Sequence, residues 1–323
     1  MKLTKRYCKV ILEKFDKNGI TEDRREFENL LNVKFTYTRY IGNSMHSKGK
    51  ISICGLTKDA IDTYTAFFSQ DVEVAKRKTI TVIAGYDDKN YGYGTIISGT
   101  VIEAIPTNPP DVWLNCTVIN QYEAKLKKDN YSFKGIKTLK EVLEWASQTL
   151  NLKLDNRLKT KQGETVQEFT EYLEDIKYKD FNFEGNKFDF VNKIGSVFYA
   201  RLSEKDSAGQ KHGGILTYIE DDTLVADFCD LLQEDYNRNG TPILVSKDSQ
   251  QCKMVGIPRP AWAGQAVSIT TLLNPSIKTG QIIKLKSDLI EALNGYYYVW
   301  NITYNGEYRG TNWYSQFLCR RLK

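Results

Sequence analysis

Three acidic clusters are the residues of this sequence whose types and spacing come nearest to catalysis. They are Asp87-Asp88, Glu220-Asp221-Asp222 and Glu234-Asp235. A glycosidase needs only two carboxyl groups, one acting as the acid and the other as the base or nucleophile. Each cluster, however, stands beside turn residues in "GYDDKN", "YIEDDT" or "LQEDYNRNG", where Asp and Asn usually bond their own backbone and stay solvated. We therefore expect a turn role and keep a Glu/Asp-pair hydrolase as the alternative.

Histidine-based and phosphate-binding chemistry has little support. His46 and His212 are the only histidines, and both stand in polar, hairpin-like loops. No Gly-x-Ser-x-Gly elbow surrounds any serine. Gly92, Gly94 and Gly99 in "NYGYGTIISG" precede a strand, whereas a phosphate cradle opens into a helix. We therefore interpret the histidines as surface residues and the glycine segment as a hairpin loop.

The cysteines are too widely spaced for a metal knuckle or a redox loop, and no calcium-binding loop occurs, so we expect no cofactor or metal. We interpret them as reduced packing residues. The start, "MKLTKRYCKVILEKF", lacks the apolar core of a signal peptide, and no apolar run is long enough to span a membrane. These features predict folding in a reducing cytoplasm without stable membrane insertion. The cysteines are Cys8, Cys54, Cys116, Cys229, Cys252 and Cys319.

The chain has 45 basic and 40 acidic side chains, and its formal net charge of +5 is a weak bias for 323 residues. Nucleic-acid-binding domains usually concentrate their basic residues in one patch or helix. The short basic segments "KLKK" at residues 125–128 and "RRLK" at the C-terminus are most simply solvated surface. Charge alone therefore gives no nucleic-acid-binding prediction.

Alternating apolar residues predict that the first part of the chain is mainly strand. A short helix beginning near Thr57 is expected within "LTKDAIDTYTAF". Many strands at short spacing with turn residues between them are typical of a barrel or sandwich. The predicted strands are "CKVILEKF", "NVKFTYTRYI", "KGKISICGL", "KTITVIAGY", "GTIISGTVIEAI" and "DVWLNCTVI".

The middle of the chain changes character after the basic segment "KLKKDNYSFKG". Thr138 and Glu141 are spaced as a capping box at the start of a helix in "TLKEVLEWASQTLNL". A second helix is expected in "NKFDFVNKIG", with Asn186 as its cap and Gly195 at its end. "SVFYARL" and "GGILTYIE" are predicted as strands, whereas "ETVQEFTEYLEDI" fits a helix and "YKDFNFEG" alternates like a strand.

From about Thr241 the strands return in an aromatic-rich sequence. "SITTLLNPSIKTGQIIKLKS" and "YYVWNITYNGEYRGTNWYSQFLC" alternate with period two, which predicts strands with one buried face. Asn305-Gly306 is the strongest short-range hairpin signal, because both central residues of a type I′ turn need positive φ. Trp300 is expected to be buried in a central strand.

The order of strands near the C-terminus weakly repeats the order near the N-terminus. In both, a Gly-initiated strand is followed by a turn and a Trp-led strand that ends near a cysteine. We therefore predict a mainly β protein with two similar barrel or sandwich domains, residues 1–124 and 223–323. They would flank a small α+β domain at residues 125–222.

These residues also carry a resemblance to a known family. "ILVSKDSQQCKMVGIPRP", "VSITTLLNPSIKTGQIIKLKS" and "YYYVWNITYNGEYRGTNWYSQFLC" resemble, in that order, the C-terminal part of baseplate hub proteins from contractile-tailed bacteriophages. "KGKISICGLTKDAID", "VIAGY" and "GTIISGTV" are similar to the first domain of that family, and "TLKEVLEWASQTLNL" resembles its helical insert. The motifs are structural, so they mark a fold more specifically than a partner.

The resemblance implies a structural, non-enzymatic part of the virion's tail baseplate that is assembled in the host cytoplasm. It implies tail-tube-like β domains in a homotrimeric ring with a central channel. The ring would join the tail tube to the spike, contact the tape-measure protein and let DNA pass without sequence recognition. The alternatives are a tail-associated cell-wall hydrolase that uses a Glu/Asp pair, and a soluble sugar- or nucleic-acid-binding β protein.

Overall fold

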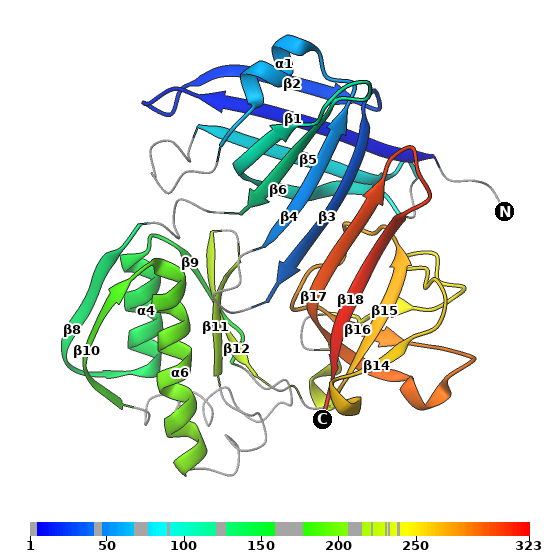
Figure 1. The fold of residues 1–323 in the computed structure, drawn as a ribbon. Coiled ribbons are helices and arrows are strands. Elements are labelled where there is room, and N and C mark those ends of the chain that lie inside the picture. The colour runs from blue at the N-terminus through cyan, green and yellow to red at the C-terminus, as the bar shows by residue number, and fades with distance from the viewer. Residues whose placement is uncertain are drawn as a thin grey trace. The chain divides into compact units, whose positions relative to one another are not determined.

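The chain is mainly β, as predicted, and has three α-helices among the described residues (Figure 1). Its contacts divide it into two compact units. Unit 1 contains Met1–Tyr40, His46–Glu123 and Pro242–Arg321, and unit 2 contains Ile41–Met45, Ala124–Thr241 and Leu322–Lys323. The computed structural model describes residues 5–41, 47–67, 77–88, 91–120, 127–158, 177–205, 215–220, 222–229, 231, 233–237 and 240–323.

One sheet of thirteen strands forms the body of unit 1. Its main path runs β14-β15-β18-β17-β3-β4-β7-β6-β5-β1-β2, and β16 pairs with both β17 and β13. All six strands predicted in the N-terminal part are present, as β1 and β3 to β7. The strands are β1 Arg6–Phe15, β2 Thr21–Glu28, β3 Asn32–Tyr40, β4 Lys48–Cys54, β5 Lys78–Tyr86, β6 Tyr93–Pro106, β7 Trp113–Ile119, β13 Ile243–Val245, β14 Arg259–Ala261, β15 Ala266–Leu272, β16 Ile282–Leu285, β17 Gly295–Glu307 and β18 Trp313–Arg321.

Short helices complete unit 1. The helix α1, Lys58–Tyr64, begins where it was expected, because the side-chain oxygen of Thr57 accepts a hydrogen bond from the amide of Ala60. Two 3-10 turns, Trp262–Gly264 and Glu291–Leu293, lie between strands of the C-terminal segment.

The pairing of β3 with β17 joins the N-terminal and C-terminal β segments into one sheet. Their antiparallel register runs from Tyr40 opposite Asn301 to Lys34 opposite Glu307. Figure 1 shows the two strands side by side, although they lie near opposite ends of the sequence. The division into domains at residues 1–124, 125–222 and 223–323 stays a prediction. This seam places strands of the first and third segments in one contact unit.

Two glycines beside β3 make room for its aromatic side chains. Gly306 of β17 pairs with Phe35, and a β-carbon at Gly306 would collide with the Phe35 ring. Gly49 of β4 pairs with Tyr37, whose Cα and ring would lie only 2.7 Å and 2.8 Å from a β-carbon at Gly49. Phe35 and Tyr37 are buried. The glycines therefore let two large rings cover the inner face of the sheet.

The hairpin turn predicted at Asn305-Gly306 is wrong, because both residues lie inside β17. The chain turns at residues 308–312, where the amide of Glu307 bonds to the carbonyl of Asn312 at 2.6 Å. Asn-Gly favours a turn because glycine accepts positive φ. Here the glycine is needed because it lacks a side chain against Phe35, so the same dipeptide continues the strand.

The burial predicted for Trp300 is also wrong. A β-bulge between Val299 and Asn301 leaves Trp300 outside the register with β18, and its side chain is only half-buried. Trp313 is the tryptophan of the core: it is 1% exposed and meets Phe35 edge-on, with ring centroids 5.6 Å apart. The bulge therefore moves the strict alternation by one residue and removes Trp300 from the buried face.

The strand β2 has no apolar alternation, so periodicity does not predict it. Its sequence "TEDRREFE" contains one apolar residue. Cross-strand ion pairs hold it against β1, with Lys9 Nζ 2.5 Å from Glu26 and Lys14 Nζ 2.8 Å from Glu22. β2 pairs only with β1, and a charged edge strand of this kind resists pairing with another chain.

The described residues of unit 2 form two small sheets and two α-helices. β8 pairs with β10, while β12 pairs antiparallel with β11 and parallel with β9. β8 begins inside the basic segment that marked the predicted domain boundary, and the helix predicted for "ETVQEFTEYLEDI" lies outside the described residues. The elements are β8 Asp129–Thr138, α4 Leu139–Thr149, β9 Lys153–Asn156, β10 Lys177–Gly185, α6 Lys187–Lys205, β11 Ile215–Glu220, β12 Thr223–Phe228 and the 3-10 helix Gln233–Asn237.

Both helix starts predicted in unit 2 are confirmed. The hydroxyl of Thr138 accepts from the amide of Glu141 at 3.2 Å, and the Glu141 carboxylate accepts from the amide of Thr138 at 2.7 Å. This reciprocal pair is the capping box of α4. Asn186 caps α6 by accepting from the amides of Phe188 and Asp189, both at 3.0 Å.

The predicted end of α6 at Gly195 and the strand predicted for "SVFYARL" are wrong, because the helix continues to Lys205. A contact with Thr217 of β11 explains why a glycine stands at position 195 inside the helix. Its hydroxyl donates to the carbonyl of Val191 at 2.6 Å and accepts from the amide of Gly195 at 3.0 Å. In an unbroken α-helix these two backbone groups bond each other. Thr217 therefore bridges these two backbone groups from β11, and Gly195, which has no side chain, allows its close approach.

Aromatic rings fill the core of unit 2. Tyr131 of β8 stacks on Phe190 of α6 with ring centroids 4.1 Å apart. Phe133 stacks on Phe181 at 5.8 Å, and Trp145 of α4 meets Phe190 edge-on at 5.5 Å. These contacts join the β8–β10 pair to both helices, which is consistent with the small α+β part expected from the sequence.

Candidate assembly surface

Charge is distributed unevenly over the sheet of unit 1. Six adjacent strands, β15, β18, β17, β3, β4 and β7, contain a single carboxylate, that of Glu307 at the end of β17. The same strands contain six basic residues, whereas most acidic residues of the sheet lie on β1 and β2. These six strands therefore form a basic region, although the charges of the whole chain nearly balance. The six basic residues are Lys34, Arg39, Lys48, Lys50, Arg320 and Arg321.

The outward surface of these six strands, called the polar face below, is built mainly from hydroxyl, amide and amino side chains, with half-buried apolar residues at the ends of its rows. On β3, Lys34 and Thr36 point outward and alternate with buried Val33, Phe35 and Tyr37. The strand registers place the outward residues in rows that cross the sheet. One row is Thr270, Gln316, Thr303, Thr38, Lys48 and Ile119, and the next is Leu272, Tyr314, Asn305, Thr36, Lys50 and Thr117.

Neighbouring side chains of the polar face bond one another across the strands. The hydroxyl of Thr36 donates to the side-chain oxygen of Asn305 at 3.1 Å, and the hydroxyls of Thr38 and Thr303 lie 3.0 Å apart. Both pairs span the seam between β3 and β17, so they add side-chain hydrogen bonds to the backbone ladder. Further pairs are Ser52 with Asn115 at 2.6 Å and Gln316 with Ser268 at 3.0 Å.

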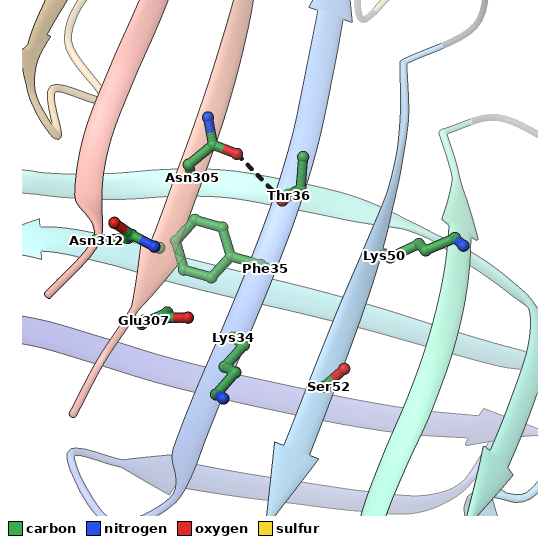
Figure 2. Close-up of a pocket in the computed structure, with 9 residues that line it drawn as sticks. Lys34, Phe35, Thr36, Lys50, Ser52, Asn305, Glu307 and Asn312 are labelled. Atoms are coloured by element: carbon green, nitrogen blue, oxygen red, sulfur yellow. Dashed lines mark hydrogen bonds between the residues drawn. The ribbon is translucent and has the colours of Figure 1, made fainter. Parts of the chain in front are cut away.

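A hollow lies in the polar face where β17 meets β3 (Figure 2). Figure 2 shows the hydrogen bond between Thr36 and Asn305 at one end of the hollow, Lys34 on β3 and Ser52 on β4 toward the other end, and Phe35 between them. The amino group of Lys34 lies 4.9 Å from the centroid of the Trp113 ring. The lining residues are Lys34, Phe35, Thr36, Lys50, Ser52, Asn305, Gly306, Glu307 and Asn312.

Described residues of two of the three acidic clusters form ion pairs, and the structure shows no catalytic carboxylate pair among the described residues. Asp222 lies 2.9 Å from Lys153, and Glu220 lies 3.6 Å from Arg157. The hydrogen bond from Lys153 lowers the pKa of Asp222. A general acid needs a raised pKa, so Asp222 is unsuited to that role.

The remaining candidates from the sequence also lack a catalytic setting where they are described. Asp87 lies in the turn after β5, 3.6 Å from Lys5. The amide of Gly92 bonds to the carbonyl of Asp88 at 2.9 Å, and Gly94 and Gly99 lie in β6, so the glycine segment is a turn into a strand, as predicted. The structure does not describe the side chains of His46, His212, Asp221, Glu234 and Asp235.

The cysteines form no disulfide bond with one another, and four of them are buried. Burial raises the pKa of Cys8, Cys116 and Cys252 to about 12, so these thiols stay protonated and unreactive near neutral pH. Within the described part of the chain, no group of three or more His, Cys, Asp or Glu side chains is placed to hold a metal ion. No described helix is both long and apolar enough to cross a membrane.

Comparison with known proteins finds one family and a set of solved structures. A family model described as baseplate hub gp41 matches residues 17–173 and 164–319. No curated protein matches the chain in sequence. A tail protein from Neisseria meningitidis MC58 has a similar structure, with a TM-score of 0.56, 7% identity and coverage of 98% of this chain and 96% of that one.

Two further solved structures share the fold. The 43 kDa tail protein of prophage MuSo2 from Shewanella oneidensis matches with a TM-score of 0.54 and 10% identity, covering 97% of this chain and 96% of that one. The E. coli c3393 protein matches with a TM-score of 0.50 and 9% identity, covering 91% and 74%. It is described as a type VI secretion component with structural similarity to the T4 tail proteins gp27 and gp5.

At such low identity the structural matches show the fold alone, whereas the family model covers most of the chain. The resemblance to baseplate hub proteins expected from the sequence is thereby confirmed. The chain belongs to the baseplate hub gp41 family, whose place is the tail baseplate of the phage virion.

Proposed function

We propose that the chain is a non-catalytic wall segment of the baseplate hub, and that three copies close into a ring around a central channel. The observation that carries this proposal is the seam between β3 and β17. It turns two β segments into one sheet with a packed core on one side and the polar face on the other. A part that holds a passage open needs such rigid sheets and no reacting groups.

The presence of two β segments in each chain supports closure of the ring with three-fold symmetry. If the segments are similar, three chains place six of them around one axis, and a three-fold spike can then be matched to a six-fold tube. Closed cyclic symmetry is the usual outcome when one surface meets a different surface on its copy. The proposed partners are two further copies, the spike, the tail tube and the tape-measure protein, and DNA passes through the channel.

Mass measurement of the assembled hub tests this proposal. The chain is co-expressed with the spike protein of the same tail, and the complex is analysed by light scattering. We expect three hub chains for each spike trimer, whereas the chain alone should be monomeric at low concentration, because the partner stabilises the closed form by mass action. A complex with two, four or six hub chains for each spike trimer would reject the ring.

The hydrolase alternative receives no support from the family, nor from Glu220 and Asp222, whose carboxylates are held in ion pairs with basic side chains. Purified chain should release no peptidoglycan fragments, and the variant with Glu220→Gln and Asp222→Asn should behave in the same way. Release by the natural chain that this double substitution abolishes would reinstate the enzyme.

A further inference from the structure

We infer that the polar face is the channel wall of the proposed ring, and that Lys34, Lys48 and Lys50 touch the phosphate backbone of double-stranded DNA there. The inference rests on the proposed function and adds the surface and the residues of the contact. It is argued from the composition, the charge and the hydrogen bonding of this face.

The composition of the polar face argues that it is not a contact between subunits. The cores of protein interfaces are enriched in aromatic residues and depleted in Lys and Ser. The polar face consists largely of Lys, Thr, Ser, Asn and Gln, and its apolar members, among them Ile119, Leu272 and Tyr314, are half-buried. None of the large, strongly exposed apolar side chains of the described chain lies on its six strands. A surface of this kind is expected to stay wet after assembly.

The charge of the polar face points to an anionic partner. Lys48 and Lys50 are exposed, stand two residues apart on the same side of β4 and form no ion pair with a described residue. Two residues of a strand span about 7 Å, so their ammonium groups can contact successive backbone charges. Lys34 adds a third cation on the neighbouring strand, and Glu307 supplies the single carboxylate of the six strands.

The hydrogen bonding of the polar face argues against reading a base sequence. Base edges are recognised by side-chain donors and acceptors that are free to reach into a groove. Here Thr36 is bonded to Asn305, and Thr38 to Thr303. The lysines are therefore the groups of this face that we expect to contact the DNA backbone. Their contact should be weak, sensitive to salt and independent of base sequence. Such a contact suits a duplex that must slide past the wall.

Salt-dependent DNA binding by the full-length chain tests the inference. The probes are two fluorescent duplexes of unrelated sequence, and anisotropy is measured between about 50 and 200 mM salt. The natural chain should bind both equally. The variant Lys34→Gln, Lys48→Gln, Lys50→Gln should bind more weakly, and its plot of log affinity against log salt should be less steep by about 2 to 3 units, one for each lost phosphate contact.

A matched variant controls for net charge. Lys17→Gln, Lys58→Gln, Lys140→Gln removes three exposed lysines that lie outside the polar face and should leave the slope unchanged. An equal loss in both variants, an absence of binding by the natural chain at low salt, or a clear preference for one duplex would overturn the inference. Competition by polyglutamate as strong as by duplex DNA would instead favour an acidic protein partner and reject DNA.

Light scattering with the spike separates this inference from the proposed function. The variant of Lys34, Lys48 and Lys50 should still form a complex with three hub chains. If the natural chain forms that ring but DNA binding ignores the three lysines, the ring stands and the inference fails. If the natural chain forms no ring, the proposed function fails whatever the DNA result.

Discussion

Phe35 and Trp313 show how single residues hold the seam of unit 1 together. Their rings meet edge-on, and the indole of Trp313 donates to the carbonyl of Gly85 at 3.1 Å. The Arg6 guanidinium lies 5.4 Å from the centre of the Trp313 ring and donates to the carbonyl of Glu307 at 3.0 Å. Residues near both ends of the chain therefore converge on one buried indole.

Removing Trp313 should be far more costly than removing Trp300. Trp313→Ala empties a fully packed site and should lower the free energy of unfolding by about 3 to 5 kcal/mol. Trp300→Ala should cost about 1 to 2 kcal/mol, because the bulge leaves its ring partly in solvent. Denaturant titrations of the two variants measure the difference, and equal losses would contradict the register described for β17.

Gly306→Ala tests the close approach of β17 to Phe35. The new methyl group would collide with the ring, so we expect a loss of about 1 to 3 kcal/mol in the free energy of unfolding. The control is the double variant with Phe35→Leu, in which the smaller side chain leaves room for the methyl group. The two losses should therefore be less than additive, and full additivity would mean that Gly306 is needed for another reason.

At the scale of elements, α6 and β2 depend on contacts that do not follow a periodic pattern. The hydroxyl of Thr217 bonds to the backbone of both Val191 and Gly195 and so fastens α6 to β11. β2 has one apolar residue, Phe27, packed against the core, and cross-strand charge pairs add to its attachment to β1. In both cases the neighbouring element supplies the interaction that the element's own sequence lacks.

Thr217→Val should destabilise the protein although it preserves the shape of the side chain. The carbonyl of Val191 and the amide of Gly195 lose their hydrogen bonds to the Thr217 hydroxyl, and a methyl group takes its place beside these buried polar groups, so a loss of about 1 to 3 kcal/mol is expected in denaturant titrations. Thr217→Ser keeps the hydroxyl and is the control, with a smaller loss expected. Equal losses in the two variants would show that the methyl group, and not the hydroxyl, holds α6 to β11.

At the scale of the whole molecule, the seam predicts that the two β segments of unit 1 depend on each other. A fragment of residues 1–123 should aggregate when expressed alone, because it exposes β3 as an unpaired edge with neighbouring buried aromatic side chains uncovered. Co-expression with a fragment of residues 242–323 should give a soluble complex of the two, detected by co-purification through a tag on one. A soluble, cooperatively unfolding 1–123 fragment would instead favour independent β domains.

The sequence by itself was sufficient for the fold class, most strands, the helix starts and the hub family, because these depend on local alternation, caps and motifs. Thr57, Thr138 and Asn186 cap their helices as predicted, since capping is decided within a few residues. The tertiary structure decided the roles of Gly306, Gly195 and Trp300, because each depends on a partner distant in sequence or on a bulge that shifts register. It also gathered Lys34, Lys48 and Lys50 on a face with one carboxylate, which the net charge conceals, since charge becomes a surface property only after distant strands pair.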